Sequence, residues 1–169
     1  MTNKIIGIQG DKLDKINISS DTSIFLAHEA QKLGYKIFYY TPSNLSIIKN
    51  KTYANGVFVK LNYERKKFYK IYKKQKIDVE NLKFILIRQD PPFNSEYLIT
   101  TLILDNLKKT RVINNPVAIR NVSEKLYSKK FTKYMPDTIF SNNIEEVKKF
   151  YKQNKSIIMK PINGYGGNQ

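Results

Sequence analysis

Residues 84–93 read Phe84-Ile85-Leu86-Ile87-Arg88-Gln89-Asp90-Pro91-Pro92-Phe93. An uninterrupted apolar run bounded by charge is typical of a parallel strand that is covered on both faces. The proline pair that follows cannot continue the strand, because proline has no amide hydrogen to donate to a sheet. The stretch therefore predicts a buried strand whose carboxyl end opens into a polar loop.

The N-terminal side of this stretch contains a strand, a helix and a second strand. Residues 4–8 and 36–40 have the pattern of buried strands. Between them we expect a helix that is capped by Ser20 or Asp21 and ended by Gly34 in the left-handed conformation. This order predicts a βαβ unit.

The C-terminal side repeats the alternation. Asn94 or Ser95 is expected to begin a helix that runs to about residue 109, and residues 111–114 form a further strand. Strands that alternate with helices predict an α/β fold with a mainly parallel open sheet and flanking helices.

Open sheets of this kind bind ligands beyond the carboxyl ends of their strands. We therefore expect three polar loops to converge at one edge of the sheet, at residues 9–11, 88–93 and 114–116. The glycine patterns of the usual dinucleotide and Walker phosphate sites are absent from the sequence, so the sheet is not a standard nucleotide binder.

The charge is the unusual feature of the composition, with 30 Lys and Arg against 14 Asp and Glu and a net charge of +16. The densest stretch is residues 60–76, where Leu61, Phe68, Ile71 and Tyr72 recur at helical spacing. We interpret it as a helix with one solvated basic face. The alternative is a surface that binds a polyanion such as nucleic acid.

Features that the sequence lacks indicate its cellular compartment and whether it is a membrane protein. It has no cysteine, no apolar run of the roughly 20 residues that span a bilayer, and no signal-peptide core after Met1. A chain without cysteine fits a reducing compartment. These observations predict a cytoplasmic protein with no membrane segment.

The last third of the sequence has a different pattern of expected helices and strands. We expect a helix at residues 122–131, a strand at 136–140, a helix at about 143–152 and a strand at 157–159. The final strand is closed by a lysine, which is costly unless an anion meets it. The glycine-rich loop that follows lets backbone amides approach phosphate oxygens. From the residues alone, phosphate binding and an ordinary turn are equally open interpretations.

Taken together, these blocks resemble prokaryotic glutathione synthetases of the ATP-grasp superfamily from the first strand to the last residue. The Asp-Pro-Pro-Phe core after an apolar strand and an arginine is the most specific of them. The blocks that carry the resemblance are Ile16-Asn17-Ile18 with Asp21-Thr22-Ser23, Arg88 to Phe93, Asn114-Asn115-Pro116 with Arg120, Glu124-Lys125-Leu126, and Ile158-Met159-Lys160-Pro161 with Gly164-Tyr165-Gly166-Gly167.

The resemblance implies an organisation and an activity. Residues 1–121 would form a Rossmann-like, pre-ATP-grasp substrate-binding domain, and residues 122–169 the incomplete first subdomain of an ATP-grasp domain. The activity would be glutathione synthase, an ATP-dependent ligase that joins γ-glutamylcysteine to glycine through an acyl phosphate. A homo-oligomer is expected for the full-length protein.

The resemblance also implies roles for individual residues. The ATP phosphates would be held by Lys125, Lys160, Gly164, Gly166 and Gly167. In the substrate crevice Arg88 would bind a carboxylate, and Asp11 or Asp90 an ammonium group, whereas turn or cap roles are the alternative for the aspartates. Mg²⁺ or Mn²⁺ would accompany ATP. Catalytic and metal-binding residues are expected outside these 169 residues, so we expect the chain alone to be inactive.

Four positions depart from the family pattern. Lys12 stands where a proline is usual, and Gln89 and Asn115 each replace a lysine, while Ser123 replaces an asparagine. The loss of two basic residues near the crevice leaves open another ATP-grasp ligase with a different acceptor. A noncatalytic nucleic-acid-binding module is the further alternative.

Overall fold

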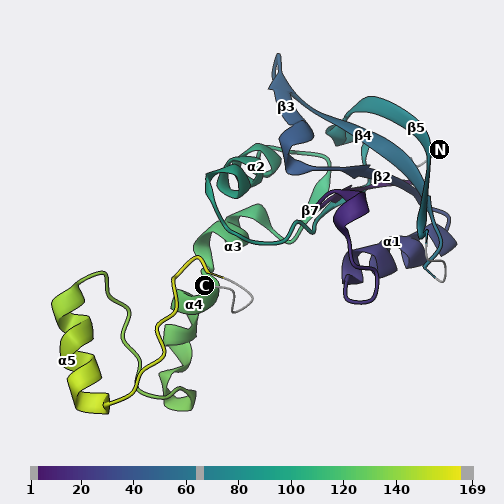
Figure 1. Cartoon of the computed structure of the whole chain (residues 1–169). Coiled ribbons are helices and arrows are strands. Elements are labelled where there is room, and N and C mark those ends of the chain that lie inside the picture. Colours follow the sequence, from purple (N-terminus) through teal and green to yellow (C-terminus); the bar gives the residue numbers. More distant parts are fainter. Residues whose placement is uncertain (1–3, 64–66, 165–169) are drawn as a thin grey trace. The chain divides into compact units, whose positions relative to one another are not determined.

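The computed structural model describes residues 4–63 and 67–164. The chain divides into two compact units, residues Met1–Arg120 and Asn121–Gln169 (Figure 1). Each unit is described by itself below.

The first unit is built on one open sheet in an α/β arrangement, as the sequence predicted. Its central strands are parallel and lie in the order β2 (Lys36–Tyr40), β1 (Ile5–Gln9), β6 (Phe84–Ile87) and β7 (Arg111–Ile113). The buried positions of β1 and β6 explain their continuous apolar sequences.

The sheet continues beyond β2 with antiparallel strands. β4 (Lys51–Leu61) pairs with β2, with β3 (Leu45–Ile48) and with β5 (Tyr69–Asp78). Among the described residues β5 pairs with β4 alone, so it is an edge strand.

The helix expected across residues 60–76 was therefore wrong, because this segment contributes to two strands of a hairpin. Leu61 and Phe68 are buried in the core, whereas Ile71 and Tyr72 are 41% and 55% exposed. The apparent helical spacing thus did not mark one buried face. Pairing with a distant strand and packing on the sheet outweigh a local pattern of this kind.

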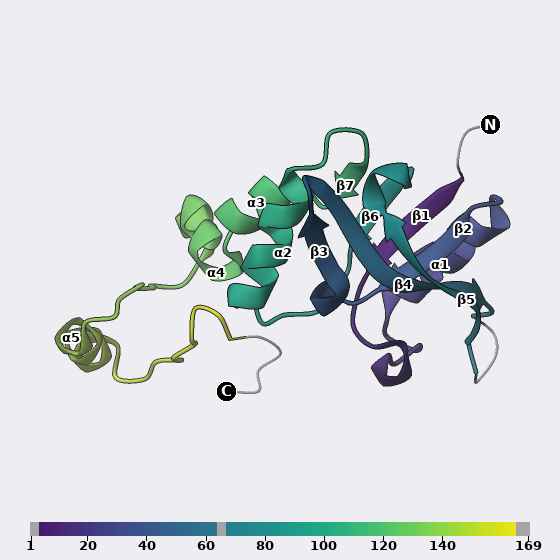
Figure 2. The same cartoon turned by 90° about the horizontal axis from the view of Figure 1, so that it is seen from above.

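Two helices cover the sheet. α1 (Thr22–Lys32) packs with the cluster that contains Ile6 and Ile8, and α2 (Ser95–Asp105) with the cluster that contains Ile85. Side chains of successive strand residues alternate between faces, so these clusters lie on opposite faces of the sheet. Figure 2 shows α1 close to β2 and α2 close to β3.

The helix ends carry the expected signals. The Asp21 carboxylate caps α1 by accepting from the backbone N–H groups of Ser23 and Ile24 at 2.6 and 3.1 Å. Gly34 follows α1 with φ of +84°. The Asn94 side chain caps α2 by accepting from the N–H of Tyr97 at 3.0 Å. These local signals explain why the helices begin where the sequence predicted.

The remaining elements are short, except for one helix of the second unit. The 3-10 helices are η1 (Leu13–Lys15), η2 (Pro42–Asn44), η3 (Val79–Asn81) and η4 (Ser128–Tyr134), and the further α-helices are α3 (Pro116–Asn121), α4 (Glu124–Tyr127) and α5 (Ile144–Asn154). None of the helices in the described ranges 4–63 and 67–164 is long and apolar enough to cross a membrane.

The second unit differs from the sequence prediction in its strands. α5 forms as expected, but the helix predicted at 122–131 breaks into α4 and η4, with a kink at Phe131. Residues 136–140 and 157–159 are not strands. A strand requires a neighbour for its N–H and C=O groups, and residues 121–164 provide none. Ile158 and Met159 are accordingly 85% and 69% exposed.

Glu80 ties the loop before β7 to η3, and its loss provides a test of this packing. Its carboxylate accepts from the backbone N–H groups of Lys108, Lys109 and Thr110 at 2.7, 2.9 and 3.0 Å. Burial raises the pKa of the Glu80 carboxyl, but the three donors outweigh burial and hold the pKa below its usual value. We predict that Glu80→Gln lowers the free energy of unfolding at pH 7 by about 1 kcal/mol, after discounting for partial exposure.

The pH dependence of this effect has a definite sign. Because the folded pKa of Glu80 lies below that of the unfolded chain, its contribution is complete above the ordinary Glu pKa of about 4.3. The contribution is lost as the pH falls through the folded pKa. Urea unfolding between pH 7 and pH 3 should therefore show the two proteins converging in acid. Glu96→Gln, at an exposed residue, is the control, and a Glu80→Gln difference that does not shrink in acid would contradict the assignment.

Gly56 is next to Val57, the residue of β4 at which its pairing with β2 ends. A Cβ atom there would lie 2.5 Å from the Phe38 ring and 2.6 Å from the Tyr39 carbonyl oxygen. The Tyr39 carbonyl belongs to the backbone and cannot move aside as the end of a flexible side chain can. We therefore predict that Gly56→Ala lowers the free energy of unfolding by about 1–3 kcal/mol. Thermal and urea unfolding measure the loss. Lys60→Ala, at an exposed residue of the same strand, should change little, and equal effects of the two substitutions would refute the steric explanation.

Candidate functional site

The candidate site lies at the carboxyl ends of β1, β6 and β7. The loops after β1 and β6 are joined directly, because the Asp90 N–H donates to the Asp11 carboxylate at 2.9 Å. The Arg88 N–H donates to the Gln9 carbonyl at 2.7 Å and extends the pairing of the two strands. β7 is parallel to β6, so the loop after it begins at the same edge. The predicted meeting of the loops at 9–11 and 88–93 is confirmed.

Arg88 is held in a fixed orientation at the start of α1. Its Nε donates to the Ser23 hydroxyl at 3.0 Å, and its Nη2 donates to the Thr22 hydroxyl at 2.7 Å. Within the part of the chain that the structure describes, no carboxylate lies within 4.0 Å of the guanidinium. Among these residues the cation therefore has a fixed orientation and no ion pair, whereas the first amides of α1 already donate to the Asp21 carboxylate.

Negative charge gathers beside this cation. Burial raises the pKa of the Asp90 carboxyl, and the neighbouring charges of Asp11 and Asp21 raise it further, while Arg88 opposes them. Burial likewise raises the pKa of the Tyr97 hydroxyl, with Asp11 and Asp90 adding to the effect. Carboxylates that repel one another favour a ligand cation. The edge thus offers one guanidinium and several carboxylates to a ligand of mixed charge.

Two side-chain contacts at this edge were not predicted from the sequence. Thr22 and Ser23 were noted there only as part of the block Asp21-Thr22-Ser23, whereas in the structure their hydroxyls orient Arg88. The second is a pair of glutamines: Gln9 Nε2 donates to Gln89 Oε1 at 2.5 Å, and the two residues are 0% and 9% exposed. Gln89, one of the departures from the family pattern, is thus a buried partner of Gln9. The sequence offered one signal for this pair, because Gln9 and Gln89 are polar residues at or just beyond the ends of two strands that pair with each other.

In the second unit, Lys125 is brought to the start of the glycine-rich loop. Its ammonium group donates to the Ile162 carbonyl at 3.4 Å and to the Gly164 carbonyl. Lys160 is exposed, and the backbone at Gly164 is buried. Gly166 and Gly167 lie outside the described residues. The structure therefore joins Lys125 to Gly164 and leaves Lys160 open to solvent.

Metal binding has no candidate ligands in the described residues. Neither range, 4–63 or 67–164, gathers three His, Asp or Glu side chains closely enough to hold an ion. These residues do not fit a resident metal site, and no step through a metal follows from them.

Comparison with known proteins gives matches over both units. The family profile described as "Prokaryotic glutathione synthetase, N-terminal domain" matches residues 5–120, and "Prokaryotic glutathione synthetase, ATP-grasp domain" matches residues 124–169. Similar proteins named glutathione synthetase occur in Mesorhizobium japonicum, with 37% identity over 163 residues, in Rhodopseudomonas palustris, with 34% over 163, and in Buchnera aphidicola of Acyrthosiphon pisum, with 36% over 164.

These alignments cover 96% of this chain in each case, and 52%, 52% and 51% of the three relatives. The chain thus spans about half the length of the relatives that it matches. The N-terminal profile alone covers more than half of the chain, and it includes the strand, the arginine and the Asp-Pro-Pro-Phe core at the sheet edge. The chain therefore belongs to the prokaryotic glutathione synthetase family.

Proposed function

We propose that the protein is a glutathione synthase, which ligates γ-glutamylcysteine and glycine at the expense of ATP. The names of its relatives and the order of the two family domains support this activity. The observation that carries the proposal is the orientation of Arg88 by Thr22 and Ser23, beside the joined loops of Asp11 and Asp90.

The sheet edge matches the charges of the peptide substrate. γ-Glutamylcysteine carries two carboxylates and one ammonium group. Arg88 would bind one carboxylate through its planar donors, which suit carboxylate geometry better than a lysine does. Asp11 and Asp90 would bind the ammonium group, and ligand binding would relieve the repulsion that raises the Asp90 pKa.

The second unit would hold the phosphates of ATP. Lys125 and Lys160, with Gly164, Gly166 and Gly167, are the proposed contacts, and the bonds from Lys125 to the loop carbonyls support its place beside them. The cysteinyl carboxylate would attack the γ-phosphorus, whose bond to the ADP oxygen breaks. The glycine amine would then attack the acyl carbon and release phosphate. Fixed ammonium groups would offset the charge that builds up during transfer.

Several further properties belong to this proposal. Mg²⁺ or Mn²⁺ would accompany ATP, the protein would be cytoplasmic, and the full-length protein would form a homo-oligomer. The peptide-binding domain would be residues 1–121, and the ATP-grasp domain would begin at residue 122. The two family profiles support the order of the domains and the use of ATP.

The peptide site is tested by Arg88→Gln in this chain. We predict that the dissociation constant for γ-glutamylcysteine, measured by isothermal titration calorimetry, rises at least about tenfold, because a hydrogen bond to a charged group contributes about 1.5–3 kcal/mol. Arg111→Gln is the matched control, since Arg111 is exposed and begins β7, at the opposite end of the strands. Equal weakening by both substitutions would exclude a specific role for Arg88.

The nucleotide site is tested by Lys125→Met and Lys160→Met. Each should weaken binding of AMP-PNP at least about fivefold, because a fixed ammonium group that meets a phosphate is lost. Lys129→Met, at an exposed residue of η4, should leave affinity unchanged. Unaltered affinity in both Lys125→Met and Lys160→Met would refute the proposed ATP contacts.

A further inference from the structure

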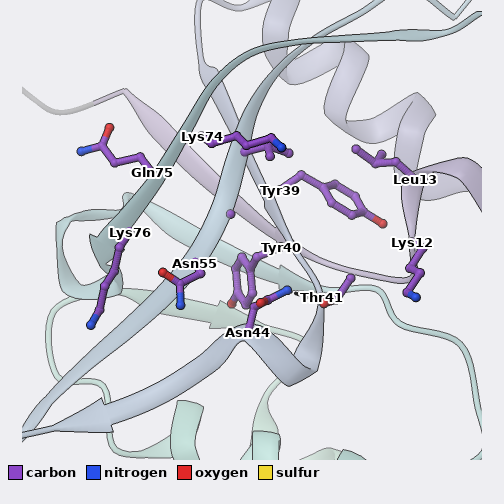
Figure 3. Close-up of a pocket in the computed structure, with 12 residues that line it drawn as sticks. Lys12, Leu13, Tyr39, Tyr40, Thr41, Asn44, Asn55, Lys74, Gln75 and Lys76 are labelled. Carbon is purple, nitrogen blue, oxygen red and sulfur yellow. Dashed lines mark hydrogen bonds between the residues drawn. The ribbon is translucent and has the colours of Figure 1, made fainter.

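A hollow of the first unit lies where β4 leaves β2. The two strands pair as far as Tyr39 and Val57, after which β4 pairs with β3 from Ala54 onward. The separation leaves a hollow of about 640 Å³, shown in Figure 3. Its volume falls within the range of small-molecule sites, about 300–1,000 Å³.

The charged residues that line the hollow are all lysines. Lys12 comes from the loop after β1, and Lys74 and Lys76 come from β5. Lys74 is paired with Val57 and Lys76 with Asn55, so both project from the same face of the hairpin. No Asp or Glu is among the lining residues.

These ammonium groups have no anionic partner in the described residues. None of the three lies within 4.0 Å of a carboxylate, although the Lys76 ammonium lies over the Tyr53 ring at 4.9 Å from its centre. Figure 3 shows them on different sides of the hollow. A lysine stem of four carbons lets each ammonium swing towards a ligand.

Tyr40 also lines the hollow, but its side chain packs in the cluster that contains Ile85, on the face of the sheet opposite to Val57 and Lys74. Tyr40 is 2% exposed, and its buried hydroxyl has no hydrogen-bond partner among the residues that the structure describes. An atom without accessible surface cannot be reached by a ligand in the hollow, so the lysines are the groups that would hold one. Thr41, Asn44, Asn55 and Gln75 also line the hollow and supply further polar groups.

We propose that this hollow is a second ligand site, which binds a compact organic anion with at least two negative charges, either a phosphate ester or a polycarboxylate. The hollow adjoins the proposed peptide contacts, because Lys12 follows Asp11 and the Tyr39 hydroxyl donates to the Asp11 carbonyl at 2.6 Å. The proposal does not depend on the ligase activity.

The test is a titration of the ¹⁵N-labelled chain with pyrophosphate and, separately, with citrate. We expect saturable amide shifts at Gly56, Gln75 and Thr41 with at least one of the two anions. If only pyrophosphate binds, the ligand is a phosphate ester; if only citrate binds, the ligand is a polycarboxylate. If both bind, the site recognises negative charge and does not distinguish the two classes. Each of these three results supports the proposal.

Charge reversal provides the decisive variants. Lys74→Glu combined with Lys76→Glu should weaken binding at least about tenfold, because two attractive contacts become repulsive. The matched control is Lys70→Glu combined with Lys73→Glu, on the same strand and with the same change in net charge. Lys73 is paired with Phe58 and Lys70 with Lys60, on the opposite face. The four lysines are exposed, so both variants should retain the wild-type melting temperature.

Three results would overturn the proposal. The first is the absence of saturable shifts at the hollow with either anion. The second is equal weakening by the two double variants, which would indicate general attraction to a basic chain. The third is a set of shifts confined to Lys125 and Gly164, which would support the proposed ATP contacts while removing the hollow as a site.

Discussion

The contact between the ends of β1 and β6 governs the arrangement of the first unit. Their parallel pairing continues past the last strand residues, through the bond from the Arg88 N–H to the Gln9 carbonyl and then from the Asp90 N–H to the Asp11 carboxylate. A shift of one residue in this register would turn each side chain to the other face. The register of β1 and β6 therefore fixes the positions of the Arg88 guanidinium, the Asp11 and Asp90 carboxylates, and the Gln9–Gln89 pair.

Much of the parallel sheet could be predicted because its signals are local. Asp21 and Asn94 cap helices through bonds to residues two or three positions away, and Gly34 adopts a conformation that glycine favours. The hairpin of β4 and β5 could not be predicted in this way, since its partners are distant in sequence. The strands predicted in the second unit were wrong because an apolar run forms a strand only when another strand lies beside it.

The candidate site also has parts that could be predicted from the sequence and parts that could not. The loops that carry Asp11, Arg88 and Asp90 were predicted from strands whose ends had to meet at one edge, and the resemblance to the family singled out these residues. Their placement is visible in the structure, while their roles in binding stay predictions. The hydroxyl partners of Arg88 and the pairing of Gln9 with Gln89 depend on which way side chains turn. Sequence spacing carries no information on those directions.

The lysines of β5 also affect how the molecule behaves towards other copies of itself. An edge strand of ten residues presents a row of unpaired backbone groups, which would ordinarily invite a strand from another molecule to add to the sheet. Two such strands laid side by side would bring like charges directly opposite one another. The basic sequence of this strand thus disfavours the addition of a second copy of the chain at this edge.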